Sequence, residues 1–372
     1  MNNKLMFVLC QSCGEKNLKQ CNHNDAERAL TGTWVIDEVV KALEKGYTIL
    51  SIFEIWHYKT VQQGDTTDGL FTAFINKFLK IKQQASGWPS GCTNQHQKDE
   101  YIRNYLVHEG VKLEEGQIIK NAGLRSMSKL MLNSFWGKFG QRENQSQTTI
   151  VRTSKELYDL LMNPAIDTNS VQVINEDVLI VNWEYKDEAA EMLPTVNVCI
   201  AAYTTAQARL KLYSYLEELG DRVLYYDTDS VIYISSEGSI DPPTGSFLGD
   251  MTDELEGEYG IGSYITEFVS GGPKHYGYEV FSTSKNKLIG KCKVKGFTLN
   301  YNVSKLINLT SMKESVMGEN TAIPITSYNI RRTKQHDVIS RTEVRNYQAT
   351  SSKRAFLDDY DSLPYGHKKL CT

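Results

Sequence analysis

Two aspartates separated by one residue stand inside an aromatic and β-branched run that extends from Tyr225 to Tyr233. Strand residues at i and i+2 point to the same side. A hairpin with Asp227-Thr228-Asp229 at its tip would therefore bring both carboxylates to one place. Carboxylate oxygens suit hard cations such as Mg²⁺, which completes its shell with water and substrate phosphates. The run indicates a metal site for nucleotidyl transfer, and the alternative is an exposed acidic turn.

A cation, an amide and an aromatic ring stand at helical spacing about ninety residues upstream. Lys129, Asn133 and Trp136 occupy positions i, i+4 and i+7, which share one face of a helix. This stripe could contact a phosphate, a base or sugar edge, and a ring. The alternative is an ordinary amphipathic helix.

Side chains of metal-binding type gather near the N-terminus: Cys10, Cys13, Cys21 and His23. Three cysteines and one histidine form a ligand set of zinc type, and the first pair has Cys-x-x-Cys spacing. The Cys-x-His spacing of the second pair is unusually tight. A buried pair of free thiols is the alternative, and Cys92 with His96 could instead complete the set.

The composition is that of a soluble globular protein: 372 residues, 40% hydrophobic and 23% charged. That length is enough for two or three domains. The sequence has no apolar run of about 18 residues, so no transmembrane helix and no membrane partner are predicted. Seven scattered cysteines, an odd number, indicate reduced thiols in an intracellular protein.

The net charge of −4 conceals a gradient along the chain. Residues 221–270 carry 11 Asp/Glu and one Arg, whereas residues 271–372 carry 17 Lys/Arg and 8 Asp/Glu. An acidic centre followed by a basic tail suits a metal site beside a polyanion track, and the alternative is a surface of mixed charge.

Hydrophobic periodicity predicts the elements that position these residues. Helices are predicted at 33–43, 70–82, 124–139 and 197–219. Strands are predicted at 47–58, 171–184 and, as a hairpin, 223–234. Residues 83–120 are polar and are expected to form a loop-rich insertion.

The two motifs resemble those of family B DNA polymerases. The run at Asp227 and Asp229 is similar to motif C, Tyr-x-Asp-Thr-Asp-Ser, and residues 129–140 resemble motif B, Lys-x-x-x-Asn-Ser-x-Tyr-Gly. Trp136 replaces the usual Tyr, which leaves the details of sugar or base-pair selection open. Residues 69–82 resemble the start of the fingers in protein-primed polymerases of organellar and viral type. Residues 130–142 and 201–212 are most similar to Polinton/Maverick transposon polymerases.

The resemblance implies roles for named side chains. It implies that Asp227 and Asp229 are the catalytic Mg²⁺ ligands. It implies that six residues bind the incoming nucleotide: Lys82, Arg125, Lys129, Asn133, Trp136 and Gly137. It also implies that nine residues contact DNA: Tyr226, Thr228, Ser230, Lys274, Tyr276, Lys293, Lys295, Arg331 and Arg332. Among these, Lys274 and Tyr276 match the Lys-x-Tyr motif that grips the primer terminus.

The resemblance also implies a reaction and a fold. A primer 3′-hydroxyl attacks the α-phosphorus of a dNTP at two metals about 3.5–4 Å apart. The expected fold class is α+β, a right hand with an antiparallel palm sheet, helical fingers and a thumb. The expected parts are a segment following motif A with a zinc-type insert (1–68), fingers with motif B (69–140), an insertion (141–195), the palm with motif C (196–270), and palm end and thumb (271–372).

One family feature is missing from the sequence. The motif A pattern Asp-x-x-Ser-Leu-Tyr-Pro does not occur, and neither does a 3′–5′ exonuclease domain. We therefore expect a chain that begins after motif A and does not polymerise alone. The alternatives are a catalytically dead remnant, a DNA-binding palm–thumb module and an unrelated zinc-containing nucleic-acid binder. Expected partners are primer–template DNA, dNTPs and a terminal protein primer. The expected source is a mobile element or virus, and the nucleus is the preferred location.

Overall fold

The computed structural model describes residues 8–59, 69–89, 91–191, 193–318, 322–333, 337–348, 353–357 and 362–370. These residues form two compact units. Unit 1 comprises Met1–Ile52, Leu212–Thr244 and Met251–Thr372, and unit 2 comprises Phe53–Lys211 and Gly245–Asp250. The end of the predicted segment 1–68, residues 60–68, lies outside the described residues.

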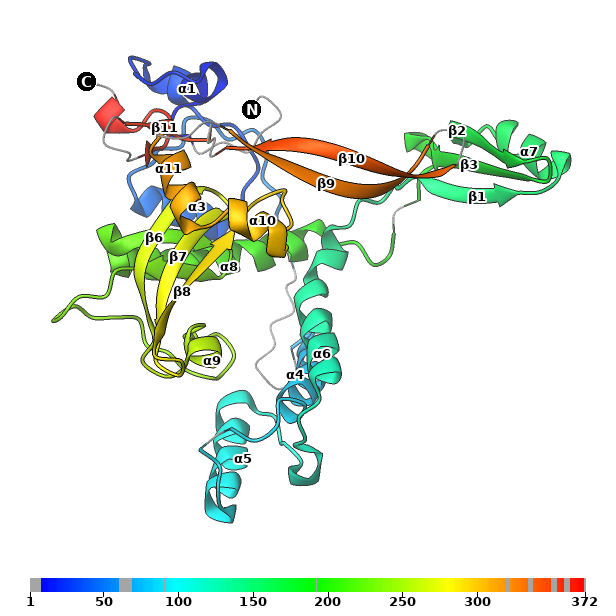
Figure 1. Cartoon of the computed structure of the whole chain (residues 1–372). Coiled ribbons are helices and arrows are strands. Elements are labelled where there is room, and N and C mark those ends of the chain that lie inside the picture. The colour runs from blue at the N-terminus through cyan, green and yellow to red at the C-terminus, as the bar shows by residue number, and fades with distance from the viewer. Residues whose placement is uncertain are drawn as a thin grey trace. The chain divides into compact units, whose positions relative to one another are not determined.

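Unit 1 contains a three-stranded antiparallel sheet in the order β6-β7-β8 (Figure 1). Its strands are Tyr264–Gly272, His275–Ser282 and Lys287–Lys293. Helix α11, Leu309–Val316, packs across all three strands. A Cβ on Gly277 of β7 would lie 3.1 Å from Leu309 Cδ1 and 3.2 Å from Met312 Sδ. Glycine at this position therefore lets the helix approach the sheet closely.

A long two-stranded ribbon also belongs to unit 1. Strands β9, Ile323–Arg332, and β10, Val338–Tyr347, pair antiparallel over their whole length. The base of the ribbon packs against α10, Tyr301–Leu306, through the buried side chains Val303, Ile307, Ile325 and Tyr347. The other elements of this unit are α1 Gln11–Lys16, α2 Asp25–Arg28, α3 Ile36–Glu44, β4 Val223–Asp227, β5 Ser230–Tyr233, α9 Glu256–Tyr259, β11 Ala355–Phe356 and β12 Ser362–Leu363.

Unit 2 combines packed helices with a second antiparallel sheet. The sheet has the order β1-β3-β2 and is built from Gln147–Val151, Val178–Tyr185 and Ile166–Asn175. The helices of this part are α4 Thr72–Gln84, α5 Gln95–Glu109, α6 Ala122–Ser134 and α7 Ser154–Leu161. Helix α8, Val198–Leu219, passes from unit 2 into unit 1. Short 3-10 turns lie at Glu115–Gln117, Trp136–Gly140, Asp187–Ala189, Gly220–Arg222 and Lys368–Leu370.

Helices combined with antiparallel sheets confirm the predicted α+β class. Every pair of named strands in the described residues is antiparallel. The helices predicted at 33–43, 70–82 and 197–219 are α3, α4 and α8. The strands predicted at 171–184 are the paired β2 and β3, and the predicted hairpin at 223–234 is β4 with β5.

Two predictions from the pattern are wrong. The strand at 47–58 is absent, although these residues are described; its apolar side chains lack a neighbouring strand and stay exposed, Phe53 by 84%. The loop-rich insertion at 83–120 is instead organised by helix α5. Asn94 and Gln97 form a capping box at its start, and Gly110 ends it in a left-handed conformation. Its buried side chains, with Tyr105 among them, form one core together with Leu79 of α4.

Candidate functional site

The two aspartates of the first motif lie at the tip of a hairpin in unit 1, as predicted. Strands β4 and β5 pair with Asp227 opposite Ser230, so Thr228 and Asp229 form a two-residue turn. Thr228 has a φ of +56°, a conformation that β-branched residues rarely adopt. Strain of this kind is kept where the surrounding structure enforces it, often at functional sites.

Local hydrogen bonds hold this turn. The Ser230 hydroxyl donates to the Asp227 carbonyl over 3.1 Å, and the Thr228 hydroxyl donates to Asp227 Oδ1 over 3.1 Å. The Asp227 side chain is half-buried and the Asp229 side chain is exposed. Two carboxylates on one short turn, at least one of them open to solvent, form a donor set that suits Mg²⁺ with substrate phosphates.

The predicted primer-gripping pair lies directly beside this turn. Lys274, in the β6–β7 turn, has a φ of +58°, and its Nζ lies 3.2 Å from Asp227 Oδ2. Its backbone N–H donates to the Tyr225 hydroxyl over 2.9 Å. The Tyr225 ring in turn packs on the Tyr276 ring with centroids 4.5 Å apart. Residues about fifty positions apart in sequence thus form one continuous cluster.

Tyr225 links the parts of this cluster, and sequence reasoning missed it. Its ring and hydroxyl connect the Asp227 strand to the Lys274 turn, and burial raises its pKa. The alternation of β4 was the signal, because it places Tyr225 on the same face as Asp227 and Tyr226 on the other. Lys293 extends the cluster, with Nζ 5.4 Å from the centroid of the Tyr276 ring, whereas Lys295 lies beyond the end of β8.

We predict that Tyr225→Phe destabilises unit 1 by about 1 kcal/mol, because the Lys274 amide loses its hydrogen-bond acceptor. Urea unfolding followed by fluorescence measures this loss. The matched control is Tyr226→Phe, which removes the same atom from a residue that is 45% exposed and should change stability by less than about 0.5 kcal/mol. Equal losses in both variants would contradict the proposed link.

Three of the predicted nucleotide-binding residues lie together in unit 2. Arg125 Nε donates to the Ser86 hydroxyl over 3.1 Å, and that hydroxyl donates to the Lys82 carbonyl over 2.8 Å. Burial lowers the pKa of Lys82, and the positive charges of Arg125 and Lys129 lower it further, while Glu109 opposes them. We call Lys82, Arg125 and Lys129 the cationic triad. Such a concentration of charge favours a polyanion.

An aromatic cluster fixes the two helices that carry the triad. Phe74 of α4 stacks on Phe135, which directly follows α6, with ring centroids 4.0 Å apart. The Asn121 amide also donates to the Ala85 carbonyl over 2.8 Å, which joins the end of α4 to the start of α6. Packing between the two helices therefore helps to position the residues of the triad.

The predicted stripe of the second motif is corrected in one respect. Helix α6 ends at Ser134, so Lys129 and Asn133 lie on it, whereas Trp136 and Gly137 lie in the 3-10 turn that follows. The 3-10 turn rotates later residues relative to an α-helix. Trp136 is 40% exposed, and Asn133 is exposed one helical turn beyond Lys129.

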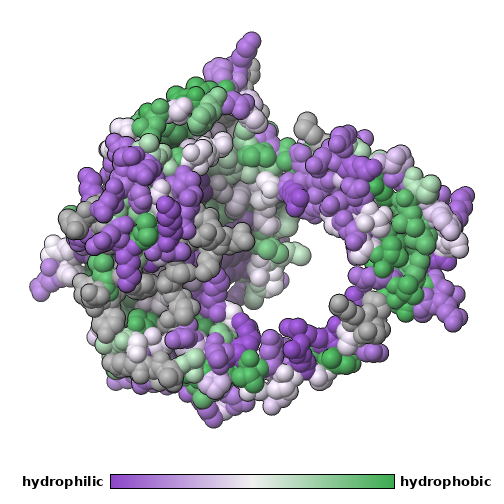
Figure 2. Space-filling view, turned by 90° about the horizontal axis from the view of Figure 1, so that it is seen from above, coloured by the Kyte–Doolittle hydropathy of each residue, from purple (hydrophilic) through white to green (hydrophobic). Residues whose placement is uncertain are grey.

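Arg331 and Arg332 lie at the end of β9, far along the ribbon from its packed base. Arg331 pairs with Glu343 on β10 at 3.6 Å, so part of its charge is offset. Tyr328 and Ile330 next to them are 83% and 78% exposed. Figure 2 shows hydrophobic residues, in green, interspersed with hydrophilic ones, in purple, on one face of the molecule. The ribbon thus presents both basic and apolar groups to solvent.

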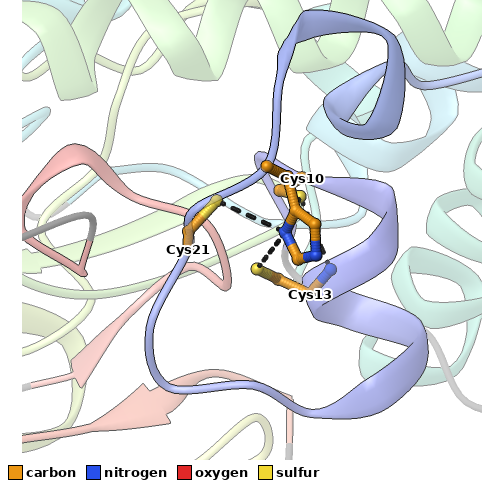
Figure 3. A group of neighbouring side chains, drawn as sticks. Cys10, Cys13 and Cys21 are labelled. Carbon is orange, nitrogen blue, oxygen red and sulfur yellow. Dashed lines mark hydrogen bonds between the residues drawn. The ribbon is translucent and has the colours of Figure 1, made fainter.

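The four predicted zinc ligands converge in unit 1 (Figure 3). The ligand atoms of Cys10, Cys13, Cys21 and His23 all lie within 4.8 Å of one another. The three cysteines are buried, with exposures of 0%, 0% and 3%. The alternative completion by Cys92 and His96 is wrong, because neither belongs to this group. Among the described residues this is the single group of three or more Cys, His, Asp or Glu side chains at such spacing.

None of the helices in the described ranges is long and apolar enough to cross a membrane.

A family model described as DNA polymerase type B, organellar and viral, matches residues 2–218, more than half of the chain. The chain therefore belongs to the type B DNA polymerases, and within them to the organellar and viral group. The matched range includes motif B and ends before Asp227, so the hairpin is an independent observation. No curated protein and no solved structure matches the chain.

Proposed function

We propose that the chain is part of a DNA polymerase that transfers nucleotides from dNTPs to a primer 3′-hydroxyl under the direction of a template, in the DNA replication of a mobile element or virus. The observation that carries the proposal is the hairpin tip with Asp227 and Asp229, braced by Lys274, in a chain of the polymerase family. The proposal includes priming by a protein, a terminal protein as partner, and a relationship to Polinton/Maverick polymerases. The nuclear location stays a prediction.

The carboxylates fit the metal that this reaction uses. Mg²⁺ is typically held by one or two carboxylates together with substrate phosphates, and the hairpin supplies two carboxylates on one turn. When bound, Mg²⁺ supplies positive charge next to the attacking and leaving oxygens. Asp227 and Asp229 would hold it. Because Lys274 already contacts Asp227 Oδ2, a metal on Asp227 must share that carboxylate or displace the ammonium group.

The other side chains bind and orient the two substrates in this proposal. The cationic triad binds the triphosphate, because positive charge in a partly desolvated place is the main protein contribution to phosphoryl transfer. Asn133, Trp136 and Gly137 lie next to it in sequence and contact the nucleotide. Lys274 and Tyr276 hold the primer terminus. The remaining contacts are to the duplex backbone, which positions DNA without reading its sequence: Tyr226, Thr228, Ser230, Lys293, Lys295, Arg331 and Arg332.

A second candidate is a catalytically dead remnant or a DNA-binding palm–thumb module. It is favoured by the composition of the hairpin site. Within the described ranges, no further Cys, His, Asp or Glu side chain joins Asp227 and Asp229 in a group of three. Synthesis needs a site that holds two metal ions. If the two carboxylates of the hairpin are too few for that, the protein would bind DNA without extending a primer.

Primer extension with Mg²⁺ and dNTPs separates the two candidates. We expect no incorporation by the 372-residue chain and incorporation once it is joined to an upstream segment that carries Asp-x-x-Ser-Leu-Tyr-Pro. The joined form tests whether Asp227 and Asp229 need a third carboxylate. DNA binding without incorporation in both forms would favour the remnant. Incorporation by the 372-residue chain alone would overturn the requirement for motif A.

A further inference from the structure

One ring nitrogen of His23 faces three sulfur atoms. His23 Nδ1 lies 3.5 Å from Cys10 Sγ, 3.4 Å from Cys13 Sγ and 3.7 Å from Cys21 Sγ. An imidazole nitrogen has either one lone pair or one hydrogen. It can therefore make a single good hydrogen bond, and three thiols around it cannot all be satisfied in that way.

A metal ion at the centre satisfies all four groups together. Zinc bonds of about 2.3 Å to sulfur and about 2.0–2.1 Å to nitrogen, at tetrahedral angles, put sulfur and nitrogen about 3.6 Å apart. The three sulfur–nitrogen distances of 3.4–3.7 Å agree with this value. Soft thiolate and imidazole ligands favour zinc over Mg²⁺ or Ca²⁺. The donor set and its geometry thus both indicate zinc.

The surroundings complete such a site. Three thiolates and one Zn²⁺ carry a net negative charge, and the Arg28 guanidinium donates to Cys21 Sγ over 2.9 Å. The Cys13 amide donates to Cys10 Sγ over 3.5 Å at the start of α1. Contacts of this type orient ligands and tune metal sites. Four protein ligands with buried sulfurs leave no open position, which is the arrangement of a structural zinc site and not of a catalytic one.

The C-terminal segment, here residues 353–357 and 362–370, contacts the residues of the cluster. Arg28 also donates to the Gly366 carbonyl over 2.9 Å, and the Leu9 amide donates to the Tyr365 carbonyl over 2.7 Å. A Cβ on Gly366 would lie 2.3 Å from Cys10 Cβ, and its φ is +84°. Only glycine therefore fits there. The buried cysteines share one core with side chains of the C-terminal segment, Ala355, Leu357, Leu363 and Tyr365.

We propose that Cys10, Cys13, Cys21 and His23 bind one structural zinc ion, and that this ion fastens the N-terminal segment of unit 1 to its C-terminal segment. The role is separate from catalysis at Asp227 and Asp229. Metal binding contributes to folding because the ligand arrangement does not exist in an unfolded chain. The C-terminal segment then depends on the metal although it supplies no ligand.

Elemental analysis of the purified chain tests the ligand set. We expect about one zinc per chain, lost in Cys13→Ser and in His23→Ala, and kept in the matched control Cys92→Ser, whose thiol lies outside the cluster. Cobalt in place of zinc should give the visible absorption of a tetrahedral thiolate site. Arg28→Ala should weaken zinc affinity by about 10–100-fold. Zinc-free, well-folded protein, or zinc that depends on Cys92, would overturn the assignment.

Amide hydrogen exchange tests the fastening of the two segments. Chelation of zinc should speed exchange at residues 8–28 and 362–370 while exchange in β6–β8 stays unchanged. Gly366→Ala should release residues 362–370 with zinc still bound. Its matched control is Gly318→Ala, which has a similar φ of +75° and open space around the added Cβ. Unchanged exchange at 362–370 after chelation would overturn the fastening, whatever the polymerase assays show.

Discussion

Asp229→Asn should lower the rate of dNTP incorporation by about 10³-fold in the form of the protein that carries motif A. The change removes one metal-binding charge, and the metal's contribution to the transition state is worth several kcal/mol. Asp229 is exposed at the hairpin tip, so the isosteric amide leaves the paired strands intact. Single-turnover incorporation measures the loss, and binding of primer–template DNA should stay within a factor of about three.

Asp227→Asn should have a broader effect than Asp229→Asn. Asp227 also pairs with Lys274, so its substitution disturbs the primer-gripping turn together with the metal site. Asp229→Asn has no such second effect. The control is Asp221→Asn, an exposed acidic residue just before β4 with the same change in charge. A wild-type rate in Asp229→Asn would remove the hairpin from the proposed mechanism.

The hairpin was predictable because local pattern and chemistry agree there. Aromatic and β-branched residues favour strands, and the two aspartates mark the turn. The contact between Lys274 and Asp227 was not predictable. It depends on how the β6–β7 turn packs on the hairpin, and no spacing rule determines a contact between residues so far apart in sequence.

Helix α5 and the segment 47–58 show why the pattern failed elsewhere. Helix α5 has few apolar residues at helical spacing, so periodicity missed it, although Asn94, Gln97 and Gly110 are recognisable capping signals. Residues 47–58 have strand composition, but a strand also needs a partner for its backbone groups. Strand preference is a weak and context-dependent signal without that partner.

The zinc-type cluster was predictable only in part. The types and spacing of Cys10, Cys13, Cys21 and His23 predicted the ligand set, and the structure brings their ligand atoms within 4.8 Å of one another. The involvement of Gly366 could not be deduced from sequence. It lies more than 300 residues away and contributes by having no side chain, which only the folded contact with Cys10 reveals.

Lys129→Met should raise the KM for dNTPs by about 10–100-fold, because a charged hydrogen-bond donor to phosphate is worth about 1.5–3 kcal/mol. The neighbours of Lys129 give the prediction a second readout. Lys129 helps to hold the pKa of Lys82 below its usual value, so removing that charge should raise the pKa of Lys82. Nucleotide binding by the variant should then persist to higher pH. The wild type should lose affinity as the pH rises through the lowered pKa of Lys82.

Steady-state kinetics over a pH series, with the form that carries motif A, measure both effects. The matched control is Lys112→Met, an exposed lysine of the same unit that lies outside the triad. It removes an equal charge and should leave KM and its pH dependence unchanged. An equal loss of primer–template affinity in Lys129→Met would contradict the triphosphate assignment, because it would place the triad on DNA. A selective change in KM, with the pH profile shifted, follows only if the three cations act together on one anion.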